Sequence, residues 1–410
     1  GRSTGFIQRQ RAFDGASFAQ TLVFGWMGDP AASLMQLSQA AANVEVGVSR
    51  QAIDQRFDER AAAFMKSVLQ AALQVSMEGA PVEVDLLQRF SGVYLLDSTC
   101  ISLPPNLQTV WPGCGGSQGA SACLKVSVLW EVLCGGLSQV DLLAGHTHDQ
   151  RAAGAQRALP AGALRVADLG YFKLRDFKRM DQAGVYWLTG YKNGTVLYQD
   201  GHRIDVLAQV QAQTAAQVDW RVAVGVRDRL PARLLARRVA AAVLARRQAR
   251  LAEWERKKQC RASPQTWALL AWDIFLTNVP PARLSADEAF TLAHYRWQIE
   301  LLFKLWKNEG LIDEWRTENP WRILCEIYAK LLALLLDHWL MLLAQWPDAA
   351  RSLTRAVATI RQFAWQLARD LNLVRGLRAT VQHIAACLQR CRTDKSSASP
   401  RAFQRFVALT

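Results

Sequence analysis

The sequence predicts an α/β fold, in which a mixed sheet follows a helical N-terminal region and precedes a helical C-terminal one. Residues 1–88 and the segment from about 281 to 392 follow helical patterns. From about Gly92, short apolar runs bounded by Gly and Pro are typical of strands. These strands come first in a meander and then alternate with helices, and that order indicates a mixed sheet.

The N-terminal region permits two interpretations. Ser49 can cap a short helix in which Ile53 and Phe57 share one face. A helix-turn-helix and a plain helical bundle are both consistent with this sequence pattern, which does not favour either.

The first strands end at acidic residues. The apolar run 93–96 predicts a buried strand that stops at Asp97, and the run 164–167 predicts one that stops at Asp168. Further elements follow the same kind of pattern: strands at 124–133, 137–143 and 185–189, a helix at 174–182, and a helical stretch that opens at Asp149.

Residues 192–278 break this rhythm and carry most of the positive charge. Short strands at 195–198 and 218–226 accompany a long basic helical stretch, and 267–276 predicts a strand. Residues 229–261 hold eleven Lys or Arg and two Glu, which is +9 of the formal charge of +14. A solvent-exposed helix would explain this charge. However, so many neighbouring positive side chains repel one another unless phosphates neutralise them. The charge favours a polyanionic partner, although composition alone does not separate DNA from RNA or an anionic membrane.

A capping box at residues 285–288 starts a long helix with one charged stripe. At about 100° per residue, Arg296, Glu300, Lys304 and Lys307 fall within an arc of roughly 80°. Most of the remaining circumference is apolar, so we expect a largely buried helix. Salt bridges within the stripe are one explanation, and a phosphate with a metal ion is the other.

Asp97, Asp168 and Glu300 together form a set that suits phosphodiester chemistry. Such chemistry uses two divalent ions about 3.5–4 Å apart, one at the attacking and one at the leaving oxygen. Mg²⁺ prefers carboxylates and keeps several waters, so three acids from separate elements suffice.

Other site classes find little support in the sequence. The eight cysteines are scattered without a CxxC pair, which favours small buried hydrophobes in a reducing cytoplasm over a zinc site or disulfides. Residues 1–20 do not look like a signal peptide. The apolar stretch 323–343 carries charged residues, so we expect a buried or partner-facing helix and no membrane span.

Several motifs between about residues 90 and 345 occur together in one known family. They are Leu96-Asp97-Ser98-Thr99, Trp111-Pro112 with Gly115-Gly116-Ser117, Ala167-Asp168 with Gly170-Tyr171-Phe172, Thr277-Asn278-Val279-Pro280, and the helix from Arg296 to Lys307. With them the chain resembles the DDE transposases of bacterial insertion sequences, in the group defined by a Tyr-Arg-Glu-Lys signature.

The signature is met with one departure. The family spacing of Arg, three residues, Glu, six residues, Lys is met by Arg296, Glu300 and Lys307. The family's Tyr normally lies three residues before the Arg, where this chain has Ala293. Tyr295 is about 100° from its neighbour around a helix, so it does not simply inherit the role.

The resemblance implies a ribonuclease-H-like core with a β-rich insertion between the second Asp and the Glu. It implies that Asp97, Asp168 and Glu300 are catalytic and hold two Mg²⁺ ions, with Mn²⁺ as a possible substitute. The enzyme would nick DNA at the element's end and use the freed 3′-OH as nucleophile. Trp297 would pack beside a displaced base, or else in the core.

The expected partners are double-stranded DNA, as terminal inverted repeats and target, and a second copy in a homodimer. The expected location is the bacterial cytoplasm, at the nucleoid when DNA is bound, without a membrane. We expect the DNA contacts to come from Arg296, Lys307, Lys304, Trp297, Tyr295, Arg237, Arg238, Arg246 and Arg247.

The expected domain boundaries follow from the changes of pattern. They are an N-terminal DNA-end-binding domain at 1–88, a catalytic core at 89–191 and 281–345, an insertion at 192–280, and a helical C-terminal region at 346–410 that could support dimerisation. Residues 394–400 within it look like a linker.

Three functions compete at this point. The first is a cut-and-paste transposase, and the second is a ribonuclease-H-like endonuclease or domesticated derivative that cuts without strand transfer. The third is a non-catalytic DNA-binding protein with the same fold. The intact acids count against the third, and the basic insertion fits the first best.

Overall fold

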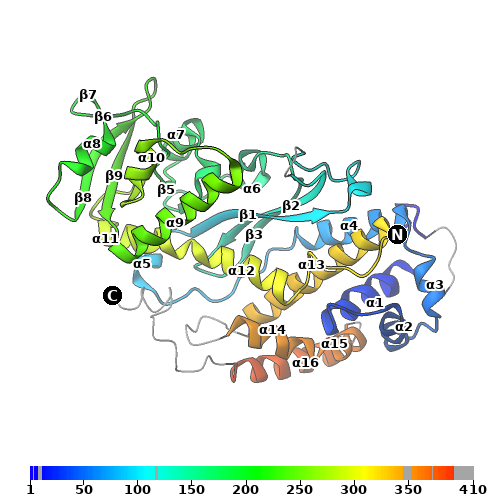
Figure 1. Cartoon of the computed structure of the whole chain (residues 1–410). Helices are drawn as coiled ribbons and strands as arrows, with labels where there is room; N and C mark the ends of the chain where they lie inside the picture. The colour runs from blue at the N-terminus through cyan, green and yellow to red at the C-terminus, as the bar shows by residue number, and fades with distance from the viewer. Residues whose placement is uncertain (3, 8–11, 116–118, 345–351, 372, 392–410) are drawn as a thin grey trace. The chain divides into compact units, whose positions relative to one another are not determined.

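The structure is a computed structural model that describes residues 1–391 except 3, 8–11, 116–118, 345–351 and 372 (Figure 1). The motif residues Gly116 and Ser117 and the expected linker at 394–400 lie outside the described residues. The described chain forms two compact units. The first unit contains residues 1–82, 98–147 and 298–391, and the second contains 83–97 and 148–297.

The first unit is built mainly of helices. Those of its N-terminal part are α1 (Gly15–Gly28), α2 (Leu34–Asn43), α3 (Arg50–Asp54) and α4 (Glu59–Ala72). Those of its C-terminal part are α12 (Trp297–Asn308), whose first residue belongs to the second unit, α13 (Pro320–Leu343), α14 (Leu353–Arg361), α15 (Ala364–Asp370) and α16 (Val374–Leu388). Ser49 caps α3 as expected, and α3 is only five residues long.

Helix α13 is the centre of this unit. It packs against α1 and α4 on one side and α14 and α16 on another (Figure 1). Most of its residues are buried, which confirms the expected buried helix at 323–343. Among the residues that the structure describes, no helix is long and apolar enough to cross a membrane.

The strands of the first unit form a small antiparallel sheet. Strand β2 (Ala122–Glu131) pairs with β3 (Leu137–Ala144), and β2 lies next to the second half of β1 (Val93–Leu103). A 3₁₀ turn, η1 (Pro105–Leu107), follows β1. The predicted strand 137–143 is confirmed, and the one predicted at 124–133 begins and ends two residues earlier.

The second unit contains a larger mixed sheet in the order β1-β4-β5-β10-β9-β8-β6-β7. The first half of β1, β4 (Leu164–Ala167) and β5 (Tyr186–Gly190) are parallel. The antiparallel strands are β6 (Leu197–Gln199), β7 (His202–Ile204), β8 (Gln217–Val224), β9 (Leu230–Arg238) and β10 (Trp272–Thr277).

Short helices and turns connect these strands. They are α5 (Asp85–Gln88), η2 (Asp149–Arg151), α6 (Ala153–Gln156), η3 (Leu169–Tyr171), α7 (Leu174–Gln182), α8 (Val206–Gln211), α9 (Ala241–Lys258), α10 (Pro264–Leu269) and α11 (Ala286–Tyr295). A core that includes Trp187, Leu234 and Leu276 joins α7 and α8 to the sheet. The predicted helix at 174–182 is confirmed, and the helical stretch predicted from Asp149 consists of the 3₁₀ turn η2 and the four-residue helix α6.

Three predicted elements of this region are wrong in part. The basic stretch is not one helix: its first third is β9, because Ala232, Leu234 and Ala236 alternate into the core. The strand predicted at 267–276 begins at Trp272, because Ser263 caps the short helix α10 before it. The capping box at 285–288 is confirmed, but its helix is divided at Arg296 into α11 and α12.

The description of the cysteines is also wrong in part. Among the described residues none of the eight forms a disulfide, but Cys100, Cys114 and Cys260 are exposed. They lie on a strand or in loops at the surface, which sequence spacing does not reveal.

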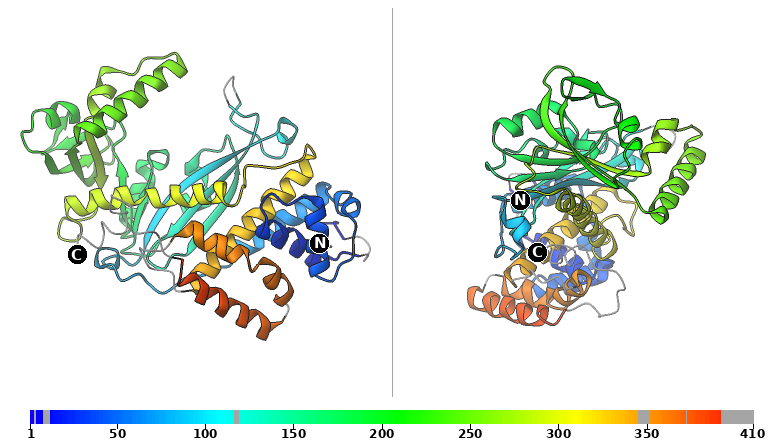
Figure 2. Two further views of the ribbon diagram at one scale, coloured as in Figure 1. Left: turned by 60° about the horizontal axis from the view of Figure 1, so that its bottom comes forward. Right: turned by 90° about the vertical axis from the view of Figure 1, so that its left-hand side faces the viewer.

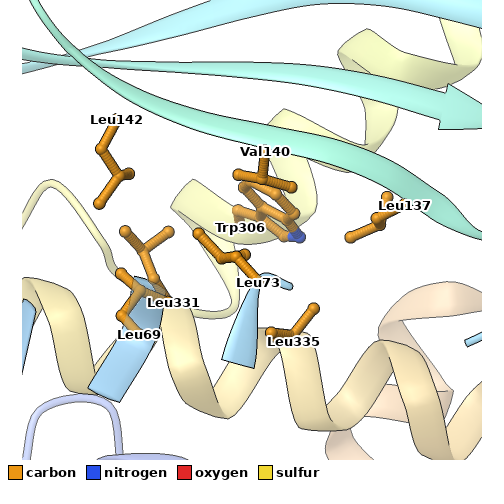
Figure 3. Close-up of a pocket in the computed structure, with 8 residues that line it drawn as sticks. All are labelled: Leu69, Leu73, Leu137, Val140, Leu142, Trp306, Leu331 and Leu335. Atoms are coloured by element: carbon orange, nitrogen blue, oxygen red, sulfur yellow. The ribbon is translucent and has the colours of Figure 1, made fainter. Parts of the chain in front are cut away.

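Helix α12 rests on an apolar layer of the first unit. Its Ile299, Leu302, Leu305 and Trp306 are buried, as expected, although Leu301 is 36% exposed. Figure 3 shows the Trp306 ring between Val140 of β3 and leucines that belong to α4, its C-cap and α13. These side chains line a cavity of about 10 Å³. A cavity this small and apolar does not hold water, so these side chains leave almost no empty space between them.

Replacing Trp306 by Ala should therefore destabilise the first unit by about 3–5 kcal/mol, since a large buried ring leaves a void. Urea unfolding followed by circular dichroism measures the change. Leu301→Ala, on the outer side of the same helix, is the control and should cost far less. Equal losses would show that α12 is not seated through Trp306.

Buried charges on α13 make the stability of this unit depend on pH. Glu326 and Lys330 pair at 2.7 Å, and Lys330 Nζ also donates to the carbonyl oxygens of Leu311 and Glu314. Asp337 is different, because one of its buried carboxylate oxygens has no hydrogen-bond partner. Burial raises the pKa of Asp337 to about 8, and Arg361 offsets this only partly.

Because the folded-state pKa of Asp337 lies above its unfolded value, unfolding releases a proton between about pH 4 and pH 8. Stability is therefore expected to fall as pH rises through this window. Asp337→Asn should remove this loss, so its advantage over wild type should grow by at most about 1.4 kcal/mol per pH unit. Urea unfolding at about pH 5 and about pH 7 measures the free energy of unfolding of both proteins, and the exposed Glu45→Gln is the control. The same difference in this free energy between Asp337→Asn and wild type at both pH values would contradict the prediction.

Candidate active site

Asp97 lies on β1 and Asp168 directly follows β4, the neighbouring parallel strand of the second unit. The last paired residues of β1 and β4 are Leu96 and Ala167, so the two acids follow at the next step of the same register. Neighbouring strands are about 4.8 Å apart, and residues in register across parallel strands face the same side. The pairing thus brings together two acids that are 71 positions apart in sequence (168 − 97).

The two acids differ in how the backbone supports them. Strand β1 does not stop at Asp97, as the sequence predicted, but continues to Leu103 because β2 gives its second half a pairing partner. Strand β4 does stop at Ala167, and Asp168 begins the turn η3. The Asp97 side chain is half-buried, whereas Asp168 is exposed.

Arg296 contacts the first acid. Its Nη1 donates a hydrogen bond of 2.8 Å to Asp97 Oδ2, and the two side chains are 21% and 17% exposed. A hydrogen bond between ionised groups in such a partly buried place is stronger than one between neutral groups. Arg296 has helical dihedral angles, φ −48° and ψ −29°, at the junction of α11 and α12.

The remaining residues of the charged stripe lie on α12 in the first unit. Glu300 is half-buried and Lys304 is exposed. Lys307 Nζ donates to the carbonyl oxygen of Cys100 at 3.0 Å and lies 3.7 Å from the Asp313 carboxylate. Lys307 is therefore anchored within its own unit.

The two aromatic candidates beside Arg296 have opposite environments. Trp297 is 47% exposed at the start of α12, where its ring can reach a ligand. Tyr295 is 8% exposed, so its ring belongs to the core of the fold.

The four arginines expected to contact DNA have different surroundings in the second unit. Arg237 lies over the Phe290 ring and 3.9 Å from Asp287, and Arg238 lies over the Trp272 ring. Arg247 forms a hydrogen-bonded ion pair with Asp273 and donates to the carbonyl oxygens of Leu270 and Trp272.

Arg246, in contrast, is exposed on α9, a helix without a buried residue. In Figure 2 this helix lies on the outside of the second unit, with α10 beside it. Only part of the basic segment is thus presented to solvent.

A buried cation, Arg165, connects β4 to α6. Arg165 lies three residues before Asp168 and donates to the carbonyl oxygen of Ala155 at 3.0 Å. Burial lowers the pKa of Arg165 to about 10, while the nearby Asp176 opposes this shift.

Gln150 is a residue that the sequence analysis did not single out. Its Nε2 donates to the carbonyl oxygens of Gly170 and Phe172, in the turn that follows Asp168. No local sequence signal reveals this contact, because the residues lie on separate elements.

The donor set fits a divalent cation by its chemistry. Asp97 and Asp168, which directly follow the last pair of β1 and β4, carry hard carboxylate oxygens, the ligands that Mg²⁺ and Mn²⁺ prefer. Within the described part of the chain, no group of three or more His, Cys, Asp or Glu side chains is arranged to hold a metal ion.

Comparison with known proteins gives a consistent picture. The model of the transposase DDE domain family matches residues 88–336, more than half of the chain. The transposase of insertion sequence IS231F from Bacillus thuringiensis subsp. israelensis is 29% identical over 359 residues, which cover 82% of this chain and 75% of that protein. The transposase of IS1151 from Clostridium perfringens is 26% identical over 357 residues, 81% of this chain and 75% of that protein. The chain thus belongs to the DDE transposase family, whose members are enzymes that cut and transfer DNA.

Proposed function

We propose that this chain cuts DNA at the ends of an insertion sequence and joins them to a target by a cut-and-paste reaction. The observation that carries the proposal is the register of β1 and β4, whose last pair, Leu96 and Ala167, directly precedes Asp97 and Asp168 in a chain of the DDE transposase family. We further propose that the core is ribonuclease-H-like, with the basic β-rich segment at 192–280 as an insertion.

The proposed ligands are Asp97, Asp168 and Glu300, which would hold two Mg²⁺ ions, with Mn²⁺ as substitute. Such a metal pair would polarise the phosphate and stabilise the charge on the attacking and leaving oxygens. The family's use of divalent ions and the two adjacent carboxylates support this assignment.

Arg296 and Lys307 are proposed to bind phosphates near the cleaved bond, and Lys304 to contact the DNA beside them. The guanidinium of Arg296 already binds a carboxylate oxygen, and phosphate oxygens offer it the same planar, charge-assisted geometry. Lys307 Nζ donates to the carbonyl oxygen of Cys100, which lies on β1 three residues after Asp97. Such phosphate contacts would position the duplex without reading its sequence.

Trp297 is proposed to stack on an unpaired base, because its half-exposed ring offers a face that any base can use. The burial of Tyr295 favours support of Arg296 from the core over direct contact with DNA. This leaves the role of the family's signature Tyr to another residue.

The rest of the assignment concerns assembly. We propose that residues 1–88 bind the terminal repeats, that residues 346–410 contribute to a homodimer, and that the protein acts in the cytoplasm, at the nucleoid when bound to DNA. In the insertion, Arg246 is the exposed candidate for DNA, whereas Arg237, Arg238 and Arg247 have internal partners that would have to be shared.

Asp97→Asn and Glu300→Gln should each abolish DNA cleavage while end binding is kept, since each change removes one charge and little volume. A gel assay on a plasmid that carries the two ends of the chain's own element measures nicking and joining, and a mobility shift measures binding. The matched control is Glu45→Gln, at an exposed position outside the proposed site. Cleavage at the wild-type rate by either variant would refute its assignment, and nicking without joining by the wild type would favour a nuclease.

Replacing the exposed Arg246, Arg250 and Arg256 of α9 by Gln should flatten the salt dependence of DNA binding, by about one unit of slope for each phosphate that is no longer neutralised. Filter binding over a series of salt concentrations gives the slope. The control removes the same charge from the C-terminal region, at the exposed Arg375, Arg378 and Arg390. An equal effect in both triple variants would attribute the change to net charge and not to α9.

A further inference from the structure

We propose that Gln150 is a positioning residue for Asp168, fixing the turn that carries this acid. The inference rests on the proposed function of Asp168 and adds a residue from a separate segment of the chain. It concerns residues of the second unit alone.

The contacts of Gln150 converge on one short turn. Its side-chain amide donates to Gly170 O at 3.3 Å and to Phe172 O at 3.2 Å, so both amide hydrogens are directed to residues 168–172. Gln156 Nε2 donates to the Gln150 carbonyl oxygen at 3.3 Å, a contact with the backbone that does not involve the side-chain amide facing the turn.

A second contact lies beside the first. A Cβ atom at Gly170 would stand 3.0 Å from Asp149 Oδ2, closer than ordinary packing allows. The absence of a side chain at Gly170 thus lets the 149–150 segment approach the turn closely. Two neighbouring residues, Asp149 and Gln150, therefore contact the same five-residue turn.

Asp168 depends on this turn because it lies beyond the end of its strand. Asp97 is held within β1 and by Arg296, whereas the pairing of β4 ends at Ala167. The Asp168 carbonyl oxygen accepts from Tyr171 N at 3.0 Å, and Leu169 O accepts from Phe172 N at 3.1 Å. These bonds close the turn locally. Gln150, which belongs to η2, connects the last residues of the turn, Gly170 and Phe172, to that segment.

A simple capping role would have a different signature. The last carbonyls of a helical turn need donors, and Gln150 supplies two. If this were its whole role, its removal would lower thermal stability, but cleavage by the folded protein would not change. If it positions Asp168, cleavage should fall by about 10–100-fold, as for residues that orient metal ligands.

The experiment compares Gln150→Ala and Gln150→Glu with wild type in the full-length protein. The glutamate keeps the size but has no amide hydrogens, so both variants should lose the two bonds. Hydrogen–deuterium exchange of the peptide spanning residues 168–172, without metal or DNA, should become about tenfold faster. Cleavage of the plasmid with the element's own ends should fall by about 10–100-fold, with unchanged end binding.

Two further variants make the outcomes separable. Gln156→Ala removes a hydrogen bond from the same loop but none from the turn, and it should keep cleavage within about twofold. Asp168→Asn tests the proposed function itself. Wild-type cleavage or exchange in both Gln150 variants, or an equal loss in Gln156→Ala, would overturn the positioning role while Asp168→Asn stays inactive. An active Asp168→Asn would instead overturn the proposed function, and the role of Gln150 with it.

Discussion

The parallel pairing of β1 with β4 is the constraint on which the proposed chemistry depends. Its register sets Asp97 next to Asp168, and a slip by one residue would turn one of the two acids to the opposite side of the sheet. The strands flanking the pair, β2 beyond β1 and β5 beyond β4, restrict such a slip by pairing with their outer edges. The sheet therefore does more than support the site, because it fixes which residues can meet.

Within that frame the two acids are held by different means. Asp97 lies inside a continuous strand and shares a short ion pair with Arg296. Asp168 lies after its strand, on an exposed turn that Gln150 ties to a neighbouring segment. A residue on a turn moves more easily than a residue within a hydrogen-bonded strand. The position of Asp168 should therefore depend more on the surrounding loop than the position of Asp97 does.

The charge of the insertion also divides into two kinds. Arg233 and Arg247 are tied to Asp219 and Asp273 and to backbone carbonyls, so they mainly hold the fold together. Arg246 of α9 is exposed and donates only within its own helix, to the carbonyl oxygen of Ala242, in the contacts described for it; it is the residue proposed to bind phosphates. Net charge alone therefore overstates the surface that a polyanion can use.

The sequence by itself determined most element types and the capping box at Ser285, and it predicted the three acids, because hydrophobic period, caps and motifs are local properties. Tertiary structure decided where a strand continues: β1 passes through Asp97 because β2 pairs with it, and the basic stretch begins as β9 because its apolar residues alternate into a core. It also decided the partners of Arg296 and Gln150. Such contacts join residues far apart in sequence, and the energy of burial and pairing that selects them exists only once the chain has folded.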